Sequence, residues 1–163
     1  IIQMPPGIPV LTVGVNNAEE AAAAAVKIVR NNAKKVNITS LKNRNAKAID
    51  KASDSLKELG ISYSCTDKLK KDAINICFID VNEKQVAAMN ELTIYCPTAE
   101  KETAADAAKL LQLTKKGVWG GLNRGENAAV AAAEIMRKND KLKEYRWNMR
   151  LKVEEADREV NER

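Results

Sequence analysis

Residues 36–65, VNITSLKNRNAKAIDKASDSLKELGISYSC, decide the fold class. Val36–Leu41 is a short run with apolar, β-branched residues that predicts a strand, and a helical pattern follows over about Ala46–Leu59. Gly60 stands where a helix commonly ends, and Ile61–Cys65 predicts a second strand. A strand, a helix and a strand in this order predict a βαβ unit with parallel strands.

The alternation of strands and helices continues toward the C-terminus. The further strands that we predict are Ala73–Val81, Leu92–Cys96, which Pro97 should end, and Val118–Leu122. The further helices are Glu83–Asn90, Lys101–Leu113, Gly125–Lys138 and the long, charged Lys141–Arg163. The expected fold is therefore an α/β, three-layer α/β/α sandwich with a parallel sheet and a long C-terminal helix.

A strand and a helix are also predicted before residue 36. Ile8–Val15 is apolar and β-branched and should form a buried strand, and Ala18–Arg30 should form an alanine-rich helix. Asn16 and Glu19 have the spacing of a capping box at the start of this helix. Asn31–Lys35 is polar and is expected to be a linker.

Composition excludes several classes of function. The 163 residues include 45% apolar and 30% charged residues, which is typical of a globular domain, and no apolar run approaches the length of a membrane span. The net charge of +5 is spread among alternating signs and aromatic residues make up 4%, so nucleic-acid binding is not supported. Histidine is absent, which excludes histidine-based triads, metal sites and acid–base catalysis within this chain.

Cysteine and glycine spacing give no metal or nucleotide site. Cys65, Cys77 and Cys96 have no metal-binding spacing, and we expect small buried residues in a reducing cytoplasm, with a reactive thiol as the alternative. The loop after Val36–Leu41 has no glycine, and the glycine-rich stretch Gly117–Gly125 has neither the Walker nor the dinucleotide spacing, so a dinucleotide or P-loop function is not supported. Ser40, Lys42 and Asn43 could retain an anion site there, although a solvated loop explains them as well.

Asp80 and Glu83 form a carboxylate pair after the predicted strand Ala73–Val81. Their positions fit the start of a helix better than a role in acid catalysis.

An internal repeat relates residues 14–32 to residues 121–139 without a gap, at an offset of 107. Ten of the nineteen pairs are identical: Gly14/Gly121, Asn16/Asn123, Glu19/Glu126, Ala21/Ala128, Ala22/Ala129, Ala24/Ala131, Ala25/Ala132, Ile28/Ile135, Arg30/Arg137 and Asn32/Asn139. Four strands precede the second copy, but none precedes the first. We therefore expect a tandem duplication in which residues 1–34 are the strand–helix end of a first domain and residues 35–163 are a second domain.

Several stretches carry a resemblance to one enzyme family. Gln3–Val10, QMPPGIPV, closely resembles a string of the phosphoribosylaminoimidazole carboxylase catalytic-subunit family, also called N5-carboxyaminoimidazole ribonucleotide mutase. Gly121–Ala129 is similar to the last strand-to-helix turn of that family, Leu142–Val153 to its C-terminal helix, and Val36–Cys65 to its opening β-α-β unit.

The resemblance implies a carboxylase (lyase) or mutase (isomerase) of de novo purine synthesis. Such enzymes move a carboxylate onto C4 of aminoimidazole ribonucleotide, use no metal or organic cofactor, and form cytoplasmic homo-octamers of flavodoxin-like subunits with shared active sites. By the same resemblance Gln3, Met4, Pro5 and Gly7 would line a substrate pocket completed outside this chain, although a rigid turn explains them equally.

The second copy lacks the functional loops of the family. Its Ser40–Asn45 retains one serine of a Gly-Ser-x-Ser-Asp type loop, and Ser64–Lys68 and Asp80–Glu83 stand where the family carries histidine-containing loops. We therefore expect a non-catalytic second domain that supports an upstream catalytic domain. The alternative is a scaffold or oligomerisation pseudo-domain that stands alone. Leu142, Tyr145, Met149 and Val153 form a narrow apolar stripe suited to a neighbouring subunit or to the same domain.

Overall fold

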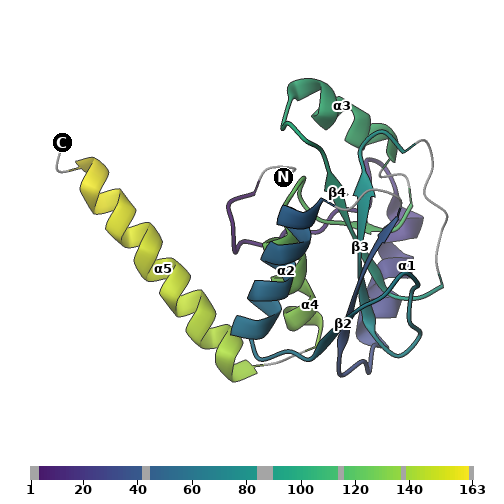
Figure 1. The fold of residues 1–163 in the computed structure, drawn as a ribbon, viewed down its shortest axis with the longest axis horizontal. Coiled ribbons are helices and arrows are strands. Elements are labelled where there is room, and N and C mark those ends of the chain that lie inside the picture. The colour runs from purple at the N-terminus through teal and green to yellow at the C-terminus, as the bar shows by residue number, and fades with distance from the viewer. Residues whose placement is uncertain (1–3, 42–44, 84–89, 114–115, 137–138, 162–163) are drawn as a thin grey trace.

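The computed structural model describes residues 4–41, 45–83, 90–113, 116–136 and 139–161 (Figure 1). Five parallel strands form one sheet in the order β2-β1-β3-β4-β5, which is the flavodoxin-like order. The strands are β1 (Val36–Leu41), β2 (Tyr63–Cys65), β3 (Ile74–Asp80), β4 (Thr93–Thr98) and β5 (Val118–Trp119). The predicted α/β class and the parallel sheet are confirmed.

Helices cover both sides of the sheet. They are α1 (Ala18–Val29), α2 (Ala46–Glu58), α3 (Ala104–Leu113), α4 (Gly125–Ile135) and α5 (Asn139–Asn161). Figure 1 shows α2 and α4 on one side of the strands, α1 on the other and α3 at the top, while α5 leads away from the sheet. Leu110 and Leu113 of α3 pack in a second, smaller core cluster with Cys77, Ile79 and Trp119. The predicted helix Glu83–Asn90 falls almost wholly outside the described residues. Within the described ranges, no helix has the length and apolar character that a bilayer crossing requires.

The larger core lies between the sheet and the α2–α4 pair. Ile74, Ile76 and Phe78 of β3 are fully buried there against alanines of the two helices. The helices approach closely at Gly125, where a Cβ would collide with the carbonyl oxygen of Ala48. Small residues on both helices therefore set the thickness of this layer.

The N-terminal strand prediction is wrong. Ile8–Val15 contains one bridge residue, Thr12, which pairs antiparallel with Trp119, and Val15 is 77% exposed. Pro9 offers no N–H for a ladder and no strand flanks the outer side of this segment among the described residues, so only a single pair forms. The predicted capping box is also absent, because Asn16 adopts φ +55° and the N-cap residue Asn17 makes no capping hydrogen bond.

Pro97 does not end its strand as predicted. It lies within β4 opposite Ile79, and its carbonyl oxygen accepts a hydrogen bond from the Asn123 N–H at 2.8 Å. The N–H that proline lacks would point the same way, beyond Trp119 where β5 has ended. The shortness of β5 therefore makes the proline tolerable.

The stripe predicted on the C-terminal helix is split between two environments. Leu142 is buried against the core, Tyr145 and Met149 are half-buried, and Val153 is 57% exposed. The first half of α5 thus packs on its own domain, while the second half exposes apolar side chains to solvent.

Replacing Gly125 tests the close contact between α2 and α4. Gly125→Ala should lower the free energy of unfolding by about 1–3 kcal/mol, because the methyl group has no room. The control is Gly120→Ala, whose Cβ would lie 3.7 Å from the Tyr95 carbonyl oxygen in an ordinary contact. Urea unfolding of both variants measures the difference, and a Gly125→Ala chain at least as stable as the unsubstituted one would contradict the packing.

Candidate functional site

The loop Met4–Ile8 is held by two side chains at the start of α4. Asn127 accepts a hydrogen bond from the Gly7 N–H at 2.7 Å, and its amide nitrogen donates to the carbonyl oxygens of Pro5 and Ile8, both at 3.1 Å. Arg124 Nε donates to the Met4 carbonyl oxygen at 3.2 Å. The buried Asn127 amide thus satisfies three backbone groups of one loop.

Gly7 fits this loop for two reasons. Its φ of +81° lies in the left-handed region, and a Cβ there would stand 2.7 Å from Tyr145 Oη and 2.8 Å from Met149 Cε of α5. The loop is therefore fixed by α4 on one side and by α5 on the other. A cavity of about 620 Å³ lies beside it, lined by Ile8, Pro9 and residues of α4 and α5.

The predicted substrate-pocket residues are only partly described. Met4 is half-buried, Pro5 is exposed and Gly7 is half-buried. Gln3 lies outside the described residues. A substrate-binding role for these four residues stays a prediction.

A second cavity, of about 290 Å³, lies at the carboxyl ends of β1 and β2, where open α/β sheets commonly bind ligands. Ser40 and Cys65 line it, and the charged side chains among its described lining residues are Asp50 and Asp67. Two carboxylates disfavour an anionic ligand. Lys42 and Asn43 lie outside the described residues, so the anion site stays a prediction.

Asn123 ties neighbouring loops together at the carboxyl edge of the sheet. Its Oδ1 accepts from the Ala99 N–H at 3.0 Å and from Asn45 Nδ2 at 3.2 Å, and its Nδ2 donates to the Ala99 carbonyl oxygen at 2.9 Å. With φ +55°, Asn123 has the same unusual backbone as Asn16, its counterpart in the repeat. These hydrogen bonds make Asn123 a structural residue of this edge.

The two repeated units contact each other reciprocally. Thr12 and Trp119, which are equivalent at the offset of 107, exchange both backbone hydrogen bonds, at 2.9 and 2.8 Å. Gly117, with φ +85°, donates its N–H to Glu20 Oε1 at 2.8 Å, just as Gly7 donates to Asn127. Glu20 and Asn127 are again equivalent positions. Each unit thus presents a glycine N–H to the helix of the other.

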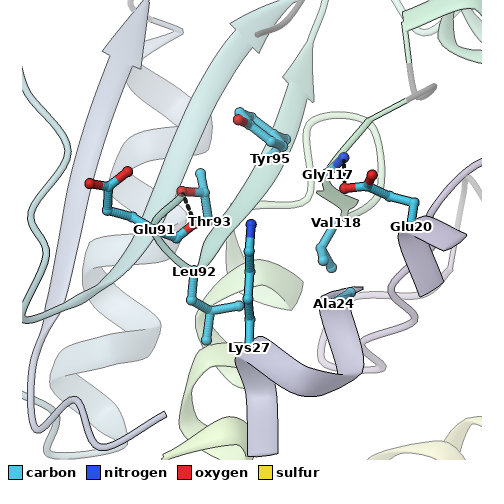
Figure 2. Close-up of a pocket in the computed structure, with 9 residues that line it drawn as sticks. All are labelled: Glu20, Ala24, Lys27, Glu91, Leu92, Thr93, Tyr95, Gly117 and Val118. Atoms are coloured by element: carbon cyan, nitrogen blue, oxygen red, sulfur yellow. Dashed lines mark hydrogen bonds between the residues drawn. The ribbon is translucent and has the colours of Figure 1, made fainter. Parts of the chain in front are cut away.

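Figure 2 shows the small cavity at the contact between α1 and the sheet. Glu20, Ala24 and Lys27 of α1 face Thr93, Tyr95 and Val118 across it. Its volume of about 20 Å³ has room for about one water molecule. This cavity is therefore too small for an organic ligand.

The cysteines occupy two different environments. Cys77 and Cys96 are buried as predicted, and burial raises the pKa of each thiol to about 12. The prediction was wrong for Cys65, which is exposed at the end of the edge strand β2. No group of histidine, cysteine or carboxylate side chains suited to a metal ion occurs among the described residues.

Asp80 stabilises a turn. Its Oδ1 accepts from the backbone N–H of Asn82 at 2.8 Å and from Asn82 Nδ2 at 2.7 Å. This turn role favours the structural interpretation of Asp80. Glu83 donates its N–H to the Asp80 carbonyl oxygen at 3.0 Å, in the same turn.

Arg124 and Asn127 were not singled out from the sequence. Both stand at non-identical positions of the repeat, opposite Asn17 and Glu20, inside an otherwise well-matched turn. The departure from the repeat is the signal that could have identified them.

Comparison with known proteins gives a family match over part of the chain and a likeness to solved structures. Residues 1–51 match the model of the AIR carboxylase family, which is less than a third of the chain. The crystal structure of a single-substitution variant of Treponema denticola PurE2 is similar with a TM-score of 0.52 and 19% sequence identity, over 77% of this chain and 96% of that chain. No curated protein sequence matches the chain significantly. At this identity the structural likeness shows a shared fold.

Thiol labelling tests the cysteine environments. We expect iodoacetamide at neutral pH to modify Cys65 and to spare Cys77 and Cys96 in the folded chain, because burial keeps these two thiols protonated and shielded. Labelling in urea, where all three should react, is the control. Mass spectrometry counts the adducts, and modification of either buried cysteine without unfolding would contradict the structure.

Proposed function

We propose that this chain is part of an enzyme of the AIR carboxylase family that acts in de novo purine synthesis. The match of residues 1–51 and the fold shared with the Treponema denticola PurE2 variant support this assignment. The proposed reaction places a carboxylate on C4 of aminoimidazole ribonucleotide, either from carbon dioxide or by transfer from N5. The product is 4-carboxy-5-aminoimidazole ribonucleotide. All three cysteines are free, with Cys65 exposed and Cys77 and Cys96 buried, and free thiols are typical of proteins in a reducing cytoplasm.

The proposed enzyme contains two related domains. Residues 1–34 are the end of the first domain, and residues 35–163 form the second. The repeat between the α1 and α4 segments supports this division.

The second domain is proposed to be non-catalytic. The chain contains no histidine, and proton transfer at a ring carbon near neutral pH needs a group with a pKa near 7. The described residues that line the cavity at the ends of β1 and β2 include no lysine or arginine to bind the phosphate of a ribonucleotide. The second domain therefore lacks both requirements of this chemistry in its described parts.

One observation carries the proposal of a supporting role. The loop Met4–Ile8 belongs to the first domain, and the side chains that hold it, Arg124 and Asn127, belong to the second. If Met4, Pro5 and Gly7 line the substrate pocket, the second domain acts by positioning this loop. Arg124 and Asn127 are then positioning residues.

Substituting Asn127 tests this role in the complete gene product. Asn127→Ala removes three hydrogen bonds to the loop and should lower kcat/KM by about 10–100-fold, mainly through a higher KM for aminoimidazole ribonucleotide. Asn127→Asp keeps the acceptor for the Gly7 N–H but places a carboxylate oxygen against the carbonyl oxygens of Pro5 and Ile8, so a loss at least as large as that of Asn127→Ala is expected. Steady-state kinetics with bicarbonate as the carboxyl source, or with the carboxylated product in reverse, measures the change.

The matched control is Glu20→Ala. It removes the reciprocal hydrogen bond to Gly117 but leaves the Met4–Ile8 loop intact, so kcat/KM should stay unchanged. Equal losses in both variants would mean a general loss of stability and no positioning role. The 163-residue chain alone should show no turnover, and a complete gene product without turnover would favour the scaffold alternative.

A homo-oligomer is the second part of the proposal. On an otherwise charged helix, α5 exposes Trp147 at 59% and Leu151 at 45%, which are four residues apart and share one face. Val153, 57% exposed, lies on a different face, in line with Leu142, Tyr145 and Met149. We propose that the face with Trp147 and Leu151 packs on a neighbouring copy.

Light scattering at micromolar concentration tests oligomer formation. The chain should exceed its monomer mass of 17.9 kDa, and Trp147→Lys with Leu151→Lys should return it to the monomer. Lys152→Glu, on the same helix, is the control for a change of charge. A monomeric unsubstituted chain would contradict the proposal.

A further inference from the structure

Helices α1 and α4 have closely related sequences but opposite environments. Ala128, Ala129 and Ala132 of α4 are completely buried, whereas their identical counterparts Ala21, Ala22 and Ala25 of α1 are exposed. The residues that precede Asn16 and Asn123 show the same contrast. Leu122 is 1% exposed, whereas its counterpart Val15 is 77% exposed. A helix whose sequence suits burial is therefore uncovered on one face in this chain.

The uncovered face is not the one that contacts the second domain. α1 uses Glu20, Ala24 and Lys27 to face β4 and β5 (Figure 2). α4 uses the equivalent positions Asn127 and Glu134 to face the segment around Gly7. The exposed alanines lie on another face of α1, as the buried alanines do on α4.

The elements that bury the alanines of α4 indicate what kind of surface would bury the exposed alanines of α1. Ala48 and Ala52 of α2, together with the apolar side chains of β3 and β4, form one core with the α4 alanines. Glu126, 8% exposed, lies 3.7 Å from Nζ of Lys51 on α2. The surface that buries the α4 alanines therefore consists of one face of the parallel sheet and of helix α2, which contributes small residues and the positively charged Lys51.

We propose that the face of α1 formed by Ala21, Ala22 and Ala25, with Val15 beside it, docks a second α/β layer equivalent to residues 36–98. This layer is the body of the first domain. Thr12 and Trp119 are equivalent positions of the repeat and exchange both backbone hydrogen bonds, which is the contact expected at a pseudo-two-fold axis between the two proposed domains. Glu20 and Asn127, also equivalent, accept from Gly117 and Gly7, which are not equivalent at the same offset. The inference rests on the proposed two-domain organisation and not on the purine chemistry.

Two details of the docked layer follow from the differences between the copies. Glu19 occupies the position of Glu126, so the covering helix carries a lysine or arginine opposite it. Ala18 occupies the position of Gly125, and its Cβ keeps the covering helix farther away than α2 is from α4. The layer is thus similar to residues 36–98 but packs less closely.

Thiol protection tests the docking. Ala22→Cys is introduced, in a Cys65→Ser background, into the complete gene product and into the 163-residue chain. Labelling by a maleimide should be at least about tenfold slower in the complete gene product, because the layer covers residue 22 there. Lys57→Cys on the outer face of α2 should label rapidly in both and is the control. Equal labelling of residue 22 in the two proteins would overturn the proposal.

Cross-linking identifies what covers the face. A photo-crosslinking amino acid at Val15 of the complete gene product should attach to a segment of the same polypeptide that aligns with residues 36–98. Attachment to α5, to another protein or to no peptide would overturn the proposal. Neither readout uses enzyme activity, so failure of the purine assignment and failure of the docking are distinguishable.

Discussion

The two hydrogen bonds exchanged by Thr12 and Trp119 join the N-terminal unit to the rest of the molecule. β5 has two residues, and its outer edge would otherwise present unpaired backbone groups to solvent. The pair fixes where the N-terminal segment crosses the sheet, and the crossing in turn places α1 beside β4 and the Met4–Ile8 loop beside α4. The site that we propose therefore depends on this edge contact together with the hydrogen bonds from Arg124 and Asn127 to the loop.

The reciprocal contacts explain why the two copies of the repeat carry different residues at the equivalent positions Glu20 and Asn127. Asn127 must satisfy one N–H and two carbonyl groups, which an amide can do because it both donates and accepts. Glu20, at the equivalent position, meets one N–H, and a carboxylate suffices as an acceptor. A pair of equivalent positions has thus diverged according to the backbone that each one faces.

Alanine content lets the same helix exist in two environments. α1 forms without burial of Ala21, Ala22 or Ala25 because alanine favours the helix by itself and loses little when exposed. α4 uses the same small side chains to approach α2 closely at Gly125. The formation of α1 and α4 is therefore determined by their local sequence, whereas the burial of each helix face depends on the elements that pack against it.

The sequence by itself determined the order of the described strands and helices from Val36 onward, the end of α2 shortly before Gly60, the repeat and the lack of histidine chemistry, because these follow from local periodicity and composition. Only the tertiary structure decided that Thr12 forms a single bridge, that Pro97 lies within a strand, and that Cys65 is exposed. It also decided that Asn127 holds a loop more than a hundred residues away in sequence. Such pairings arise between distant segments, and their partners leave no periodic pattern in either one.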